Sequence, residues 1–202
     1  VRTPTDEART FSFADGFRAE LVASEPMVQD PVVVSFDEDG RLWVVEMRGF
    51  MPTVDGTDEN APTGRVSILE DTDDDGRADR STVFLDGIVL PRAVAKVAGG
   101  ALVAHGGKLF MVHDGDGDGR ADRKPDGTRD EDEVDPEYAV KGNPEHQANG
   151  LLWGRDNWIY SANSVARFRR IGGRWVKDRT EFRGQWGIDH DDWGRLYYDV
   201  NY

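Results

Sequence analysis

Two aspartate-rich loops have the residue types and the spacing that bind a hard cation. Residues 71–79 read DTDDDGRAD and residues 114–122 read DGDGDGRAD, so both follow the pattern DxDxDGRAD. In a calcium loop, carboxylates at positions 1, 3 and 5 turn inward, a glycine at position 6 permits a sharp turn, and position 9 acts directly or through water. The pattern therefore predicts calcium ligands at Asp71, Asp73, Asp75, Asp79, Asp114, Asp116, Asp118 and Asp122.

Position 12 of both loops departs from the helix-flanked calcium loop. Thr82 and Pro125 stand where that loop has a bidentate glutamate, and no amphipathic helical pattern flanks either segment. A structural clip that joins two strands fits these features better than a calcium sensor that opens a helix pair. The alternative, that the loops are solvated acidic turns, stays open.

A second candidate site centres on His146. It lies in residues 145–150 (EHQANG), immediately before a predicted hairpin. A neutral imidazole beside a carboxylate is a suitable general base for removing the proton of an alcohol. A histidine in a loop is often structural or solvated, so that alternative stays open as well.

Four further polar residues stand next to equivalent hairpins. Glu46 and Arg48 follow the first, and Arg183 and Gln185 precede the last. Together with His146, they suggest a polar pocket of mixed charge at one end of the fold. The alternative is that the two arginines pair with the acidic surface.

These candidates depend on a repeated hairpin for their positions. An apolar strand, a tight turn containing aspartate and an aromatic-rich strand recur at residues 32–46, 149–162 and 186–199, with a degenerate copy at 93–105. Period-two alternation bounded by Gly, Asn and Asp predicts strands throughout. Repeats of roughly 40–50 residues with four strands each are typical of propeller blades.

The sequence therefore predicts an all-β fold, a β-propeller. Outer strands are expected at residues 64–69, 81–85, 108–113, 166–171 and 174–177. These give about three to four blades, fewer than a closed ring needs. We expect an N-terminal extension over residues 1–15 and a partial propeller over 16–202 that continues beyond the C-terminus, because the chain lacks an initiator Met and ends in an alternating run. A β-sandwich is the alternative.

Composition excludes several classes of function. With 39 acidic and 25 basic side chains, the net charge is −14, which argues against a nucleic-acid partner. The absence of Cys excludes disulfides, thiolate metal sites and covalent c-type haem within these residues. The sequence contains no apolar run of about 18 residues, so it predicts no membrane span in this segment. Phosphate-binding, nicotinamide and serine-hydrolase motifs are also absent from the sequence.

Three segments resemble the propeller domain of planctomycete-type membrane-bound dehydrogenases, also described as haem-binding proteins. They are GRLWVVEMRGF at 40–50, GRVSILEDTDDDGRADRSTVFLDGI at 64–88 and NGLLWGRDNWIYSAN at 149–163. That family is distantly similar to soluble sugar dehydrogenases that use pyrroloquinoline quinone (PQQ) on a six-bladed propeller. The resemblance implies a six-bladed parent and an extracytoplasmic (periplasmic or cell-surface) location.

The resemblance also implies roles for single residues. In the soluble dehydrogenases a His in a DHQ-like stretch is the base, which implies that role for His146 within EHQ. An Arg-Asn pair there corresponds to residues 183–187 (RGQWG), so Arg183 matches and the Asn does not. We expect Arg183 to be catalytic with His146, and Glu46, Arg48, Gln147, Asn149 and Gln185 to contact the cofactor.

Two functions are therefore expected. The first is the propeller domain of a sugar or alcohol dehydrogenase that uses PQQ and calcium and passes electrons to a c-type cytochrome domain outside this chain. In that case the partners are a carbohydrate or alcohol substrate and the electron-accepting cytochrome. The second is a non-catalytic propeller, stabilised by calcium, that binds a glycan or a protein.

Overall fold

Strands arranged as consecutive antiparallel meanders make up most of the computed structural model, which describes residues 2–200. Three sheets have four strands each, and every strand pairs with its neighbour in the chain. The first sheet contains β1 (Pro31–Phe36), β2 (Leu42–Glu46), β3 (Gly64–Glu70) and β4 (Arg80–Ile88). The second contains β5 (Ala93–Val97), β6 (Gly100–His105), β7 (Lys108–His113) and β8 (Glu131–Asp135). The third contains β9 (Asn149–Trp153), β10 (Ile159–Ala162), β11 (Ser164–Ile171) and β12 (Arg174–Arg183).

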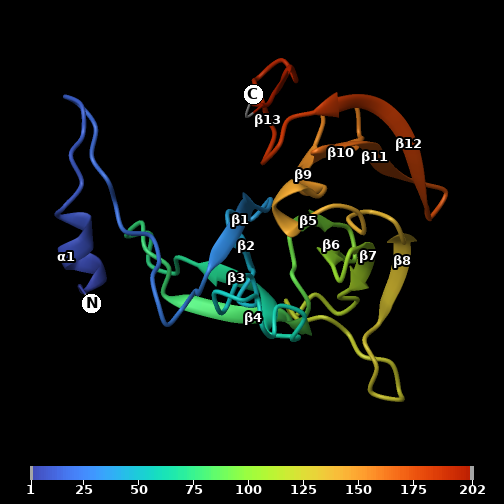
Figure 1. Ribbon diagram of the computed structural model, residues 1–202, viewed down its shortest axis with the longest axis horizontal. Helices are drawn as coiled ribbons and strands as arrows, with labels where there is room; N and C mark the ends of the chain where they lie inside the picture. The colour runs from blue at the N-terminus through green and yellow to red at the C-terminus, as the bar shows by residue number, and fades with distance from the viewer. Residues whose placement is uncertain (1, 201–202) are drawn as a thin grey trace.

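A two-stranded sheet follows, made of β13 (Asp189–His190) and β14 (Leu196–Tyr197). The first strands of successive sheets are neighbours, since β5 contacts both β1 and β9, and the three sheets lie side by side in Figure 1. This arrangement confirms the all-β prediction and fits a propeller-like fold. All four predicted hairpins and the predicted outer strands are confirmed. Ring closure and a six-bladed parent remain predictions.

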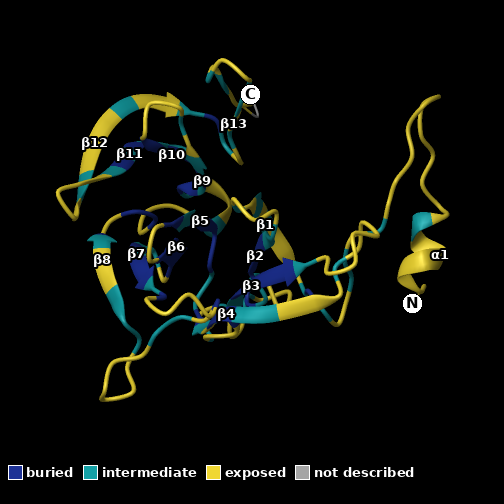
Figure 2. Ribbon diagram, turned by 180° about the vertical axis from the view of Figure 1, so that it is seen from behind, coloured by how far each residue is buried: buried dark blue, intermediate teal, exposed yellow. Residues whose placement is uncertain are grey.

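The middle sheet is buried on both faces, which explains why its hairpin looked degenerate in the sequence. Ala101 and Val103 of β6 pack into a cluster with Trp43 and Ile68 of the first sheet. The alternate residues of β6, Leu102 and Ala104, pack into a second cluster with residues of the third sheet, including Leu151, Ile159 and Phe168. Because both faces are apolar, the alternation of polar and apolar residues disappears. Figure 2 shows this buried interior between more exposed outer strands.

Strand β8 was not predicted, because its sequence EDEVD reads as a solvated acidic loop. In the fold it pairs with β7, and cations from neighbouring strands offset its charge. Lys108 contacts Glu133 at 2.6 Å, and Lys177 contacts Asp135 at 2.6 Å. Sheet formation therefore brings the basic partners that the local sequence lacks.

Helical structure is limited to short segments in the described residues. Helix α1 (Pro4–Ala8) lies within residues 1–15, and its N-cap is Thr3, whose side chain accepts a hydrogen bond from the Asp6 amide. The 3₁₀ turn η1 (Pro144–His146) precedes β9. Within residues 2–200, no helix has the length and apolar character needed to cross a membrane.

Candidate functional site

A cleft of about 740 Å³ lies along the first strands of the three four-stranded sheets. Residues of β1, β5 and β9 line it, together with residues 186–190 of the last segment. Exposed aromatic side chains in its lining include Phe36, Trp153 and Trp186. Its polar groups include Lys96, Asn149 and His190. Apolar surface with a few polar groups is the usual composition of a small-molecule site.

His146 does not line this cleft itself, but the segment that precedes β13, which lines the cleft from Trp186 onward, holds the turn that contains it. Its Nδ1 atom lies 2.9 Å from Gln185 Nε2. The indole N–H of Trp186 donates to the carbonyl of Glu145 at 2.8 Å, so two adjacent residues anchor the turn that contains His146. The structure therefore brings together His146 and Gln185, which the sequence had placed in one pocket.

Asn149 links the same two segments through hydrogen bonds. This residue is fully buried. Its amide nitrogen donates to the carbonyls of Gln147 at 3.0 Å and of Gln185 at 2.8 Å, and its carbonyl oxygen accepts from the Gly187 amide. Because the side-chain amide bonds three backbone groups, Asn149 sets the geometry of the His146 turn.

Arg92 is a part of this site that sequence reasoning missed. It is 2% exposed, and its Nη1 donates to the carbonyl of Pro144 at 2.8 Å, on the turn that ends at His146. Burial lowers the pKa of the guanidinium, while Tyr138 opposes that shift. The signal that could have identified Arg92 is its position directly before a predicted inner strand, which matches the position of residues 147–148 before β9.

Among residues 2–200, no hydrogen bond joins Arg183 to His146. Its Nη1 donates to Thr180 Oγ1 and to the Glu181 carbonyl, and its guanidinium lies 4.8 Å from the centre of the Tyr160 ring. These contacts occupy the face and one end of the guanidinium. The catalytic role predicted for Arg183 remains a prediction, and it requires the side chain to leave these partners.

Glu46 and Arg48 form a separate cluster. Glu46 is fully buried, and its Oε2 accepts from Arg48 Nε at 3.1 Å and from the Gln29 amide at 2.9 Å. Its other oxygen accepts from the Ser67 hydroxyl. Among residues 2–200, no hydrogen bond or ion pair joins this cluster to His146. Glu46 and Arg48 therefore form a buried ion pair whose carboxylate is fully hydrogen-bonded, which is an arrangement typical of a structural role.

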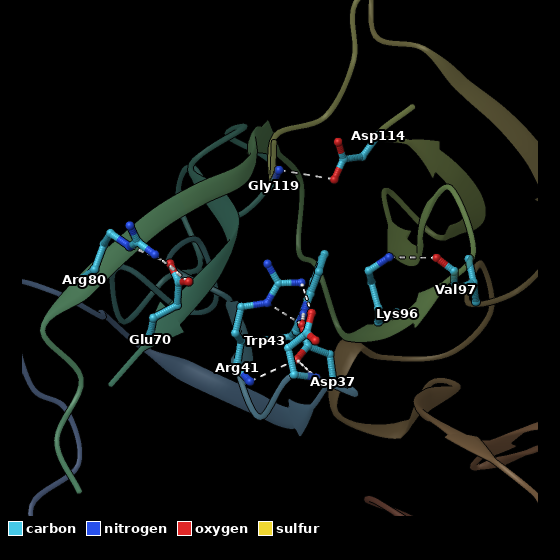
Figure 3. A network of polar contacts seen from close by, with 10 residues as sticks. Asp37, Arg41, Trp43, Glu70, Arg80, Lys96, Val97, Asp114 and Gly119 are labelled. Atoms are coloured by element: carbon cyan, nitrogen blue, oxygen red, sulfur yellow. Dashed lines mark hydrogen bonds and ion pairs between the residues drawn. The ribbon is translucent and has the colours of Figure 1, made fainter. Parts of the chain in front are cut away.

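The two aspartate loops share one hydrogen-bond pattern. At position 1, Asp71 and Asp114 accept from the glycine amide at position 6, Gly76 and Gly119. At position 5, Asp75 and Asp118 accept from the amide at position 7 at 2.8 Å. At position 9, Asp79 and Asp122 accept from the amide at position 2. The two loops, which share a sequence motif, therefore have the same local fold. Figure 3 shows the hydrogen bond between Asp114 and Gly119.

Carboxylate oxygens gather in both loops, but on different subsets of the predicted ligands. Oxygens of Asp71, Asp73 and Asp79 lie within 4.8 Å of one another in the first loop, as do those of Asp114, Asp116 and Asp118 in the second. In the first loop the charges of Asp79 and Asp75 raise the pKa of Asp73. Asp75 and Asp122 accept backbone hydrogen bonds but lie outside these groups.

Comparisons with known proteins agree with this fold. Residues 3–202 match a family model described as "Domain of unknown function (DUF7133)". A solved structure described as a "putative gluconolactonase" superposes with a TM-score of 0.51 and 16% sequence identity, covering 89% of this chain and 58% of that one. At that identity the likeness concerns the fold alone, and the chain spans little more than half of its neighbour. No curated protein matches the chain.

Proposed function

The chain belongs to the DUF7133 family over residues 3–202, and on the basis of the site we propose that it is the propeller domain of an extracytoplasmic oxidoreductase of sugars or alcohols. Its electrons would leave through a c-type cytochrome domain outside these residues. The observation that supports this proposal most strongly is the contact of His146 with Gln185 beside an aromatic-lined cleft.

The cleft suits a carbohydrate ligand. Trp153 and Trp186 are partly exposed in its lining and present apolar ring area, while their indole N–H groups already donate to the carbonyls of Lys96 and Glu145. Lys96 and His190 add polar groups to the same wall. The structural neighbour described as a gluconolactonase is named for a sugar derivative, which agrees with this ligand class.

Proton transfer by His146 requires one orientation of the Gln185 amide. When Gln185 Nε2 faces the ring, it donates to His146 Nδ1. The neutral imidazole then has its proton on His146 Nε2. After a 180° rotation of the amide, Gln185 Oε1 accepts from the Nδ1–H group of His146. The Nε2 atom of His146 then has a free lone pair. Amide nitrogen and oxygen exchange places in that rotation without other changes. We propose that, in this second orientation, His146 Nε2 removes a hydroxyl proton from the substrate.

The described residues do not by themselves form a quinone site. PQQ is a polyanion, and Lys96 is the one lysine or arginine that lines the described cleft. Arg48 and Arg183 are occupied by Glu46 and by Tyr160, Thr180 and Glu181, respectively. A bound quinone would supply the hydride acceptor. The residues of this chain would bind the substrate and transfer its proton.

A dye-linked assay tests the proposal. The complete protein, and not residues 1–202 alone, is incubated with PQQ and calcium, and dye reduction is followed with a panel of sugars and alcohols. His146→Ala should lower turnover by roughly 10²–10⁴-fold while leaving KM nearly unchanged, because a general base acts on the chemical step. His113→Gln is the matched control, since His113, at the end of β7, pairs with Asp132 of β8 and does not line the cleft. Equal turnover of His146→Ala and the unmodified protein would remove the proposed base.

The second candidate function is a non-catalytic propeller that binds a glycan or a protein. The partners of Glu46, Arg48 and Arg183 favour it, because these three charged candidates are bound to other protein groups and do not line the cleft. Titration of the same sugar panel by calorimetry, without quinone, distinguishes the two. Sugar binding with no oxidation and no hydrolysis of added gluconolactone would support the binding module.

A further inference from the structure

Asp114 is a buried carboxylate with an unused oxygen. The residue is 7% exposed, and its Oδ2 accepts from the Gly119 amide at 3.3 Å (Figure 3). Its Oδ1 is buried and has no hydrogen-bond partner. Burying a charged oxygen without a partner is costly, so the loop is incomplete without a further group. Carboxylate oxygens of Asp116 and Asp118 lie within 4.8 Å in the same cluster, so the neighbours of Asp114 add negative charge instead of offsetting it.

The burial of Asp114 results from docking of its loop on the first sheet. The Ala121 amide donates to the carbonyl of Phe84 in β4 at 2.8 Å. A side chain at Gly119 would meet Ile68 and Thr82 of β3 and β4. Beyond the loop, Arg129 donates to the carbonyls of Asp86 and Gly87, also in β4. The segment between β7 and β8 therefore crosses from the second sheet onto the outer strand of the first.

We propose that the loop of residues 114–122 binds a calcium ion through Asp114, Asp116 and Asp118, and that this ion locks the second sheet onto β4 of the first. The ion supplies the partner that Asp114 Oδ1 lacks. Hard carboxylate ligands select a hard cation, and a glycine-rich loop of irregular geometry suits calcium better than magnesium, which requires a near-ideal octahedron. Gly117 and Gly119 have φ values of +74° and +79°, so the loop already has the backbone bends at positions 4 and 6.

The first aspartate loop provides an internal comparison. It has the same hydrogen-bond pattern, and its Ala78 amide donates to the carbonyl of Val22 as Ala121 does to Phe84. However, Asp71, Asp73 and Asp79 are all exposed, and water can solvate each of them. We therefore restrict the assignment to the second loop.

Calorimetric titration of metal-free protein with calcium tests the site. The unmodified protein should take up an ion that Asp114→Asn no longer binds, while Glu137→Gln, the same change at an exposed acid of the same acidic segment, should retain it. If Asp114→Asn fails to fold, Asp116→Asn, at an exposed ligand, gives the same readout. Asp73→Asn should leave this uptake in place. Absence of uptake, retention of it in both second-loop variants, or equal binding of magnesium would overturn the assignment.

Hydrogen exchange tests the clamp. Calcium should slow amide exchange at least several-fold in β4, residues 80–88, as well as in the loop itself. Asp114→Asn should abolish that protection, whereas Glu137→Gln should not. Calcium binding with protection confined to residues 71–79, or with none in β4, would contradict the proposed link between the two sheets.

Discussion

The carboxylate of Asp37 accepts the indole N–H of Trp43 at 2.9 Å across the turn that joins β1 to β2 (Figure 3). The same side chain is fully buried and also accepts from the Arg41 amide and from Arg41 Nε. Asp191 repeats this arrangement in the last hairpin, where it accepts from the amide and Nε of Arg195 and from the Tyr197 hydroxyl. The shared motif DxxGRL therefore encodes a turn whose aspartate also positions an aromatic ring.

Asp37→Asn should lower the free energy of unfolding by about 2 kcal/mol, because one amide N–H₂ would face the donors of Trp43 and Arg41 and the ion pair would be lost. Urea unfolding followed by tryptophan fluorescence measures the loss. Glu38→Gln, at the exposed neighbouring position, should change stability by less than about 0.5 kcal/mol. Similar unfolding midpoints for the two variants would contradict the role assigned to Asp37.

The turn aspartates should also make stability depend on acid pH. Burial raises the pKa of Asp37, but hydrogen bonds from Trp43 and Arg41 outweigh it and hold the pKa below its ordinary value. The balance has the same direction for Asp156 and Asp191. A carboxyl whose pKa is lower in the folded state stabilises the fold above its ordinary pKa, and this stabilisation is lost as the pH falls through the folded value.

The free energy of unfolding should therefore fall steeply below about pH 4, the ordinary range for aspartate. Urea midpoints measured between pH 7 and pH 2.5 give the profile. Asp37→Asn should flatten it, because one of the groups responsible no longer titrates. A profile of unchanged steepness in that variant would show that Asp37 does not contribute.

The sequence predicts the hairpins well because their turns are encoded locally. Asp37, Gly40 and Arg41 lie within five residues of each other, so one motif specifies both the bend and its hydrogen bonds. Strand β8 escaped prediction because Lys108 and Lys177, which offset its acids, come from other strands. The degenerate hairpin of β5 and β6 is explained only by the sheets on both of its faces.

The candidate site could be predicted only in part, for the same physical reason. His146 was found because its loop position is visible in the sequence. Arg92 was not found, and Asn149 was expected to contact the cofactor and not to anchor the turn, since both act by bonding backbone carbonyls, which any sequence provides. Glu46 and Arg48 follow a strand as a pocket residue would, but the sequence does not reveal that Ser67 and the Gln29 amide already satisfy the carboxylate.

Two adjacent glycines, Gly99 in the turn after β5 and Gly100 at the start of β6, should respond very differently to alanine. Gly99 has a φ of +81°, and a Cβ there would meet nothing within 4 Å. Gly100 has a φ of +144°, and a Cβ there would collide with the carbonyl oxygen of Val112 in β7. Gly99→Ala should cost about 1 kcal/mol through backbone strain alone.

Gly100→Ala should cost roughly 3 kcal/mol or more, because strain and the displacement of β7 add together. Thermal and urea unfolding of both variants provide the comparison. Costs within 0.5 kcal/mol of each other, a difference of about the size expected at an indifferent surface site, would show that the turn relaxes and that Val112 is not a fixed neighbour.

Arg92 should act as a positioning residue for the turn that contains His146. Among residues 2–200 it has no carboxylate partner, and its contact with the Pro144 carbonyl lies in a buried environment. Arg92→Met should therefore keep the unfolding free energy within about 1 kcal/mol of the unmodified protein, since an apolar side chain of similar length avoids burying an unpaired charge. Amide exchange in residues 145–147 should become at least several-fold faster, because the turn loses an anchor.

Arg92→Lys should give intermediate exchange rates, as its ammonium can still donate to a carbonyl, and Lys141→Met, at an exposed position close to the turn, should leave the rates unchanged. Hydrogen exchange measured by mass spectrometry on the three variants separates local loosening from global unfolding. If the exchange of residues 145–147 rises only in proportion to the global loss of stability, Arg92 supports the core and not the His146 turn. Sugar binding at the cleft should then weaken no more in Arg92→Met than in Lys141→Met.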